Sequence, residues 1–363
     1  MVFMTVIFIS CNREKDFIAP SDYGSDPQQI FEAFWNGIDQ NYVFFNYDPV
    51  DWDQIYNSFA GKVNASTTNT QLINIFTQMM EPLIDHHKIL KVNDKDYGGV
   101  FNSNYTKNYP ITNFESLVLR EYLDTAGRFK LSSVIDEDNK KVTVDQYFGG
   151  KIRFKKIFYF RSRTFIGNAL QDEQFKSEFI YRIDTLNSKG YDFILDLRNN
   201  GGGNATEFAA LVSLFPGRTF TWGYSKVRTA RDRFTMSPYF PETIPSSGPG
   251  IKRKIAVLVN RYSFSAAELT TMALSGLPNV VVIGDTTGGA TGPISDETLF
   301  TGSFTLPNGW KVQLAQRATF DINKKIYEGK GIAPDISVKE SQTAIDNGND
   351  LVLDKAIDYL GTH

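Results

Sequence analysis

The chain has 363 residues, enough for about two domains of roughly 150 residues each and for a sizeable hydrophobic core. Lysine and arginine number 38 against 41 aspartate and glutamate residues, so no strong positive field favours nucleic acid or an anionic membrane surface. Hydrophobic residues make up 41% of the chain, as in globular proteins, and a single cysteine excludes an internal disulfide.

The first residues resemble the signal of a bacterial lipoprotein. The apolar run from Val2 to Ile9 suits a signal peptide and is too short to span a membrane. Cys11 follows this run, and in a lipoprotein box such a cysteine becomes the lipidated first residue; a free, buried cysteine is the alternative. We expect residues 1–27 to be signal peptide and tether, and the protein to be a periplasmic or outer-membrane lipoprotein that meets the membrane only through the lipid on Cys11.

The next part of the chain is expected to be helical. Apolar residues recur at helical spacing from Gln28 to Ile84, with a helix entered near Thr70 and closed before Pro82. We expect residues 28–92 to form a helical region that ends in the histidine motif. Residues 93–150 alternate in short stretches among Asn, Gly, Asp and Lys, which indicates strands and loops of a connecting region. This interval is short for a complete peptide-binding PDZ module, and we expect none.

From residue 151 to 363 the pattern alternates between strands and helices, which predicts an α/β core with parallel strands. Ligands of such sheets bind beyond the carboxyl ends of the strands, so the chemistry is expected in the turns at 198–204 and 260–265. The expected elements are strand Ile152–Phe160, helix Gln171–Lys189, strand Phe193–Leu197, helix Ala205–Leu214, strand Ile255–Val259, helix Ala266–Ser275 and strand Val280–Ile283.

The first of these turns contains three consecutive glycines, Gly201, Gly202 and Gly203. Glycines allow positive φ and let backbone N–H groups face one point, so the turn can form an anion or oxyanion site. An ordinary tight turn without a ligand is the alternative. The spacing fits neither a phosphate loop nor a dinucleotide-binding fingerprint.

The second turn brings Ser265 to the start of a helix. A hydroxyl there lies beside backbone amide donors and the positive end of the helix dipole, which would stabilise an oxyanion. The alternative is structural, because Ser265 and Glu268 have the spacing of a helix capping box.

Together the two turns resemble the tail-specific, or C-terminal processing, serine peptidase family, in which an Asp-Leu-Arg-x-Asn-x-Gly-Gly turn precedes a Ser-x-Ser-x-x-Glu turn. Segments 283–290 and 328–335 also resemble family motifs, so the resemblance covers about residues 150–340. It implies a crotonase/ClpP-like serine protease core with Ser265 as nucleophile. It further implies an oxyanion hole shaped by Gly202 and Gly203, with the Ala266 amide as a second donor.

The larger branch of this family uses a lysine base 25 residues after the nucleophile, where this chain has Ala290. The tricorn-like branch uses a histidine instead, and besides the final residue this chain has only His86 and His87. The segment Leu83–Leu90 resembles the family's Leu-x-Asp-Gly-His-Thr-x-Leu, which aligns His87 with the catalytic histidine. His86 occupies the place of a serine that assists the relay in tricorn-like enzymes, and is a possible auxiliary residue.

Glu328 matches the acidic residue of the tricorn-like branch and is expected to orient His87; an exposed carboxylate in a glycine-rich loop is the alternative. A metal or surface site is the alternative for the histidine pair, but we expect no metal and no cofactor. The leading prediction is an endopeptidase that acts on proteins or peptides through an acyl-enzyme on Ser265. A non-catalytic binding protein on the same fold, or an esterase, remains open, and the oligomeric state is not indicated.

Overall fold

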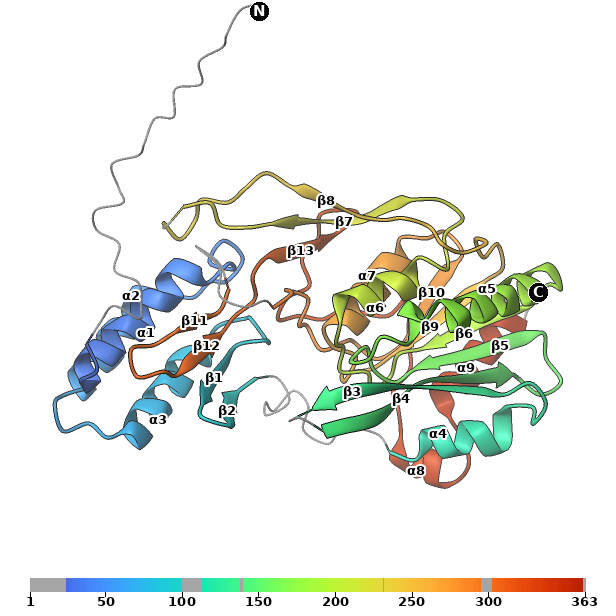
Figure 1. The fold of residues 1–363 in the computed structure, drawn as a ribbon, viewed down its shortest axis with the longest axis horizontal. Coiled ribbons are helices and arrows are strands. Elements are labelled where there is room, and N and C mark those ends of the chain that lie inside the picture. The colour runs from blue at the N-terminus through green and yellow to red at the C-terminus, as the bar shows by residue number, and fades with distance from the viewer. Residues whose placement is uncertain (1–23, 100–111, 138–139, 231, 295–301, 362–363) are drawn as a thin grey trace, which may run out of the picture.

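The structure, a computed structural model, describes residues 24–99, 112–137, 140–230, 232–294 and 302–361 (Figure 1). Cys11 lies outside these ranges, as do the expected signal peptide and most of the tether. Across the described ranges, every helix is too short or too polar to serve as a membrane span.

Three helices begin the described chain: α1 (Pro27–Asn41), α2 (Trp52–Phe59) and α3 (Asn69–Met80), with a 3-10 turn at Ala60–Lys62. Asp26 caps α1, where Pro27 fits the first helical position because its missing N–H is not needed there. Thr68 and Gln71 form a capping box at the start of α3, so this helix begins before the expected entry at Thr70. It ends at Met80, before Pro82 as expected.

The N-terminal helices pack on a small antiparallel sheet that combines strands from residues 89–98 with strands from residues 304–313. Its strand order is β11-β12-β1-β2. The strands are β1 (Ile89–Val92), β2 (Lys95–Gly98), β11 (Phe304–Thr305) and β12 (Lys311–Gln313). We call these helices and this sheet the N-terminal lobe; one hydrophobic cluster unites its helices with residues 304–320.

The rest of the chain forms the main lobe around a seven-stranded sheet of order β14-β10-β9-β6-β5-β4-β3. The five strands from β14 to β5 are parallel, and β4 and β3 join antiparallel. They are β3 (Phe129–Glu137), β4 (Lys140–Lys151), β5 (Ile157–Ser162), β6 (Asp192–Asp196), β9 (Ile255–Val259), β10 (Val280–Gly284) and β14 (Ile336–Ser337).

Helices cover both faces of the main sheet, and the parallel strands β6 and β9 are buried along their whole length, as expected for a sheet packed on both sides. One face carries α5 (Glu173–Ser188), α6 (Ala205–Val212) and α7 (Ala266–Ser275), after a 3-10 turn at Ala169–Gln171. The other carries α4 (Phe114–Leu117) with the π-helical turn Val118–Tyr122, α8 (Gln342–Asp346) and α9 (Leu351–Gly361).

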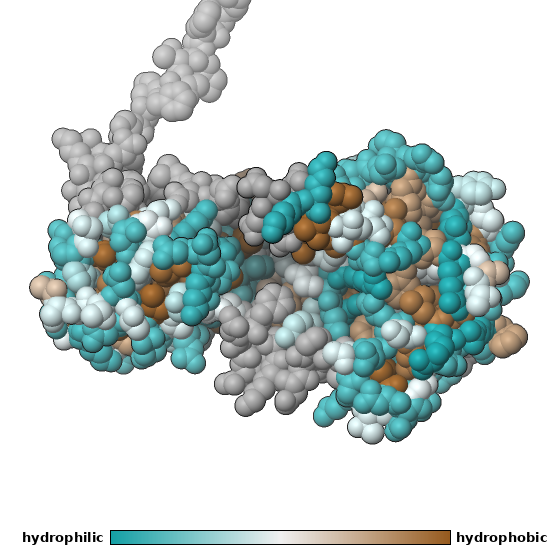
Figure 2. All heavy atoms as spheres, turned by 60° about the horizontal axis from the view of Figure 1, so that its bottom comes forward, coloured by the Kyte–Doolittle hydropathy of each residue, from teal (hydrophilic) through white to brown (hydrophobic). Residues whose placement is uncertain are grey.

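A third sheet, of order β13-β7-β8, reaches from the main lobe towards α1 and α2 (Figure 1). Its strands are β7 (Phe220–Lys226), β8 (Phe240–Ile244) and β13 (Ala318–Asp321). Arg233, in the connection between β7 and β8, pairs with Asp39 and Asp53 on the N-terminal helices. On the face seen in Figure 2, hydrophilic residues cover most of both lobes, and hydrophobic residues appear in small groups.

Most expected elements of the core are confirmed, but the strand expected over Ile152–Phe160 is wrong. The chain turns between β4 and β5, and Phe154 at that turn has φ 59° and is 98% exposed. No glycine or proline marks this turn, so the pattern of apolar residues predicted one continuous strand across it. The region 93–150 also contains α4, and its β3–β4 hairpin belongs to the main sheet, so this sheet begins before residue 151.

Candidate active site

Ser265 lies in the turn between the buried strand β9 and helix α7. Its φ of 53° and ψ of −120° are rare for a residue with a side chain, and such strain is held at functional sites when the surroundings impose it. Its hydroxyl makes no capping hydrogen bond, so the capping-box interpretation of this side chain is wrong. A half-buried serine at the start of a buried helix remains available for chemistry.

Glu268, one turn into α7, ties the serine turn to the loop after β10. Its buried carboxylate accepts hydrogen bonds from Thr287 Oγ1 at 2.5 Å, Gly289 N at 2.7 Å and Ala290 N at 2.6 Å. Burial raises the pKa of this carboxyl to about 7, against the lowering effect of these donors. The structure therefore assigns Glu268 a role in fixing two loops against each other.

The glycine turn packs directly on Ser265. A Cβ added at Gly202, which has φ 89°, would lie 2.7 Å from the Ser265 Cβ and 2.9 Å from the Ala266 nitrogen. The Gly202 N–H donates to Asn200 Oδ1 at 2.8 Å, whereas the N–H groups of Gly203 and Ala266 have no hydrogen-bond partner among the described residues. Gly202 thus gives space beside the serine, and Gly203 and Ala266 are the candidate oxyanion donors.

We expect Gly202→Val to lower the rate of peptide hydrolysis by about 10²–10³-fold, because its side chain would displace Ser265 and the Ala266 amide. The measurement is kcat/KM on a peptide substrate, with circular dichroism to verify folding. Gly61→Val is the control, since an added Cβ at Gly61 meets no atom within 4 Å. A fully active Gly202→Val would show that the oxyanion hole lies elsewhere.

An ion-pair network holds the glycine turn in place, and sequence reasoning did not assign roles to its members. The buried Arg198 guanidinium contacts Asp196 Oδ2 at 2.7 Å and Asp350 Oδ1 at 2.8 Å. Burial raises the pKa of Asp196, but the charges of Arg198 and Arg161 outweigh it and keep this pKa below its usual value. The motif that begins Asp-Leu-Arg therefore holds the end of β6 against the start of α9. Sequence spacing could not identify Asp350 as a partner of Arg198, because the two residues are far apart in the chain.

The histidine motif precedes β1 and so belongs to the N-terminal lobe. The Asp85 carboxylate is fully buried; it accepts the His87 N–H at 2.8 Å and the Ala315 N–H at 2.7 Å, which joins the motif to the chain after β12. His86 Nδ1 lies 2.7 Å from the Gly288 carbonyl oxygen. The two histidines thus have different surroundings, and the Asp85 contacts fix the backbone of His87.

Burial lowers the pKa of His87 to about 4, and its Nδ1 is buried without a hydrogen-bond partner among the described residues. An imidazole with a lowered pKa is neutral at physiological pH, which is the state a general base requires. The structure therefore gives His87 the protonation state that the predicted role needs.

Glu328, in the loop between β13 and β14, is completely buried, so its interpretation as an exposed carboxylate is wrong. Its Oε2 accepts hydrogen bonds from Thr291 N at 2.7 Å, Thr291 Oγ1 at 3.0 Å and Gly292 N at 2.6 Å. Its Oε1 accepts the His86 N–H at 3.2 Å. Burial, with Asp85 and Glu268 as further causes, raises the pKa of Glu328 well above its usual value.

The nucleophile, the glycine turn and the histidines open on one cavity of about 520 Å³. His86, His87, Ser265 and the three glycines line it, together with Ala290, which stands where the larger branch has its lysine. Among the described residues that line this cavity there are two histidines and no lysine. The cavity therefore brings together residues that are about 180 positions apart in the chain.

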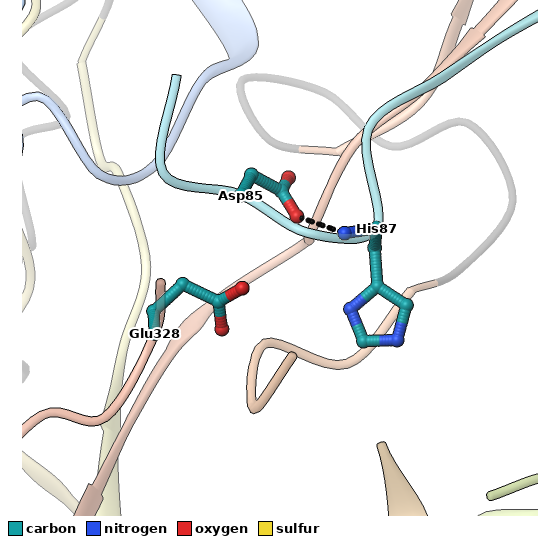
Figure 3. A group of neighbouring side chains, drawn as sticks. All are labelled: Asp85, His87 and Glu328. Carbon is teal, nitrogen blue, oxygen red and sulfur yellow. Dashed lines mark hydrogen bonds between the residues drawn. The ribbon is translucent and has the colours of Figure 1, made fainter. Parts of the chain in front are cut away.

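Asp85, His87 and Glu328 are the described residues that could hold a metal ion, because one ligand atom from each lies within 4.8 Å of the others (Figure 3). Backbone N–H groups already donate to both carboxylates, and Glu328 Oε2 accepts three donors. A metal would have to compete with these donors, and we propose none.

Comparison with known proteins gives the family of the chain. A strained serine between a strand and a helix, with a glycine turn packed on it and histidines in the same cavity, is the arrangement used by serine peptidases. The model of peptidase family S41 matches residues 156–338, which is half of the chain, and the chain belongs to this family. The model of the tricorn protease C1 domain matches residues 24–81, which contain α1 to α3.

Three similar proteins illustrate the relationship. A tail-specific protease of Haemophilus influenzae is 29% identical over 171 residues, 45% of this chain and 23% of the relative. A nisin-resistance protein of Lactococcus lactis is 25% identical over 217 residues, 58% of this chain and 65% of the relative. The chain thus spans less than two thirds of either relative's length. The solved structure of a putative peptidase from Parabacteroides merdae has a TM-score of 0.73 and 25% identity, covering 93% of this chain and 97% of that one.

Proposed function

We propose that the protein is a serine endopeptidase that hydrolyses peptide bonds of proteins or peptides through an acyl-enzyme on Ser265, with His87 as general base. The observation that carries this proposal is the strained Ser265 in a cavity shared with the histidine pair, in a chain of family S41. Similarity to a tail-specific protease and to a putative peptidase supports a protein or peptide substrate.

In the proposed mechanism, Ser265 Oγ attacks the scissile carbonyl carbon while its proton passes to the imidazole of His87. The electron pair of the carbonyl moves to its oxygen, which the N–H groups of Gly203 and Ala266 stabilise at the positive end of α7. The protonated His87 then gives its proton to the leaving amine. Water, activated by the same imidazole, hydrolyses the acyl-enzyme.

Labelling with a serine-reactive fluorophosphonate, followed by peptide mapping, tests this function. A label on Ser265 together with peptide hydrolysis supports the proposal. A label with hydrolysis of esters alone would instead make the protein an esterase. Absence of both label and hydrolysis would favour a non-catalytic binding protein on the same fold.

We propose further that the protein is exported and carries a lipid on Cys11, as its N-terminal sequence indicates. In cells fed a clickable fatty acid, the wild type is expected to take up the label and Cys11→Ala to lose it entirely, because the thiol is the attachment atom. Ser10→Ala is the matched control and is expected to keep the label. An unlabelled wild type, or one retained in the cytoplasm, would contradict the prediction.

A further inference from the structure

Two buried carboxyl groups lie beside the ring of His87. Figure 3 shows that a ring nitrogen of His87 faces the side on which Glu328 and Asp85 lie. One oxygen of each carboxyl and a ring nitrogen of His87 are all within 4.8 Å of one another. Both carboxyl groups are 0% exposed. Sequence reasoning assigned a role to Glu328 and none to Asp85.

The hydrogen bonds of the two groups leave acceptor capacity unused on both carboxyl groups. Glu328 Oε2 accepts three donors, but its Oε1 accepts only the His86 N–H, at 3.2 Å. The two oxygens of Asp85 accept one backbone N–H each. Acceptor capacity therefore remains on two carboxyl groups that each have an oxygen within 4.8 Å of a ring nitrogen of His87. Nδ1 of His87 is buried and has no hydrogen-bond partner among the described residues.

One positive charge, the Lys88 ammonium, acts on both Asp85 and Glu328, and the neighbouring His86 acts on Asp85. The ammonium also donates a hydrogen bond to the Leu83 carbonyl oxygen. Glu268, packed from α7, adds a further negative charge near Glu328. Burial raises the pKa of Asp85 and that of Glu328, and the charge of Asp85 raises the pKa of Glu328 further. Two adjacent carboxyl groups under these conditions do not both ionise at neutral pH.

We propose that Asp85 and Glu328 act as an acid pair that shares one proton and carries one negative charge facing Nδ1 of His87, and that Asp85 is a positioning residue for the base. The proposal rests on the proposed function, in which His87 is that base. The charge of the pair favours the tautomer with hydrogen on Nδ1, so Nε2 is free to accept the serine proton.

The proton count of the step is then complete. The Ser265 proton moves to Nε2 as the Oγ–carbon bond forms, and His87 becomes an imidazolium. The single negative charge of the pair balances the imidazolium, while the shared proton stays between the two carboxyl groups. The gap between pair and ring in this structure is expected to tighten in the substrate complex, as such contacts commonly do.

A double-mutant cycle tests the pair. Asp85→Asn and Glu328→Gln are each expected to lower kcat by about 10-fold, because either leaves one carboxyl that can ionise. The double variant is expected to lose about 10³-fold or more, beyond the product of the two single effects, with KM little changed. If the fold-losses in kcat of the two single variants multiply to the fold-loss of the double variant, the pair does not exist. The same holds if Glu328→Gln alone loses as much kcat as the double variant.

Infrared spectroscopy of the full chain tests the shared proton without any need for activity. At about pH 8.5, Glu268 and Glu340, whose pKa values are about 7, are ionised. The pair is expected still to show the carbonyl band of a protonated carboxylic acid, which persists in Glu268→Gln and disappears in Glu328→Gln and in Asp85→Asn. A wild type without this band overturns the proposal. A wild type with it, but inactive on peptides, leaves the pair in place and contradicts the proposed function.

Discussion

Ser265→Ala is expected to abolish peptide hydrolysis and fluorophosphonate labelling, because it removes the atom that forms the acyl-enzyme. The hydroxyl makes no capping hydrogen bond, so the free energy of unfolding is expected to change by less than about 0.5 kcal/mol. Rate assays, labelling and thermal unfolding of the purified variant measure these effects. Retained hydrolysis in Ser265→Ala would end the peptidase hypothesis.

Ser263 is the matched control, since its hydroxyl is the nearest competitor in the sequence. The structure buries this hydroxyl, which donates to the Leu197 carbonyl oxygen at 2.9 Å and accepts the Asn260 N–H at 3.0 Å. We therefore expect Ser263→Ala to keep the label on Ser265 and most of the activity while losing about 1–3 kcal/mol of stability. Loss of labelling in a folded Ser263→Ala would place the nucleophile in doubt.

His87→Ala is expected to lower kcat by several orders of magnitude, because it removes the proposed base and no other described residue that lines the cavity matches the family histidine. His86→Ala is expected to lose far less, since only position 87 matches the histidine of the tricorn-like motif. Glu328→Gln is expected to lie between them. Steady-state rates of the three variants on one peptide measure this order. A His86→Ala variant that loses more kcat than His87→Ala would contradict it.

The pH profile of kcat/KM gives an independent test of the base. A protonated His87 cannot accept the serine proton, so activity is expected to fall with acid along one ionisation. Burial lowers the pKa of His87 to about 4, so the midpoint is expected below the usual histidine value of about 6.5. A profile that still rises above about pH 8, with His87→Ala active, would indicate a lysine base.

Lys330, Lys324 and Lys325 would then be the first candidates, but none of them lines the cavity. The Lys324 ammonium lies over the rings of Tyr224 and Tyr239. A lysine base would therefore require these side chains to move on substrate binding, and a structure of the acyl-enzyme would reveal that movement.

The amino-acid sequence alone determined the local chemistry of the two turns and most of the main lobe. The spacing of apolar residues gave β9 and α7 with their observed bounds, because these elements are buried and periodic along their length. The glycine triplet stood out because glycine suits the positive φ of Gly202 and Gly203, and Ser265 because it stands at the start of a helix. The turn at Phe154 was missed because neither glycine nor proline marks it.

Only the tertiary structure decided the surroundings of the base. The contacts of Asp85 with Ala315 and of Glu328 with His86 join residues 230 and 242 positions apart, and no spacing rule reaches that far. Residues after β10 return to pair with β1, which carries the histidine motif to the cavity of Ser265. Burial, which lowers the pKa of His87 and raises those of Asp85 and Glu328, is a property of that packing and not of the residues themselves.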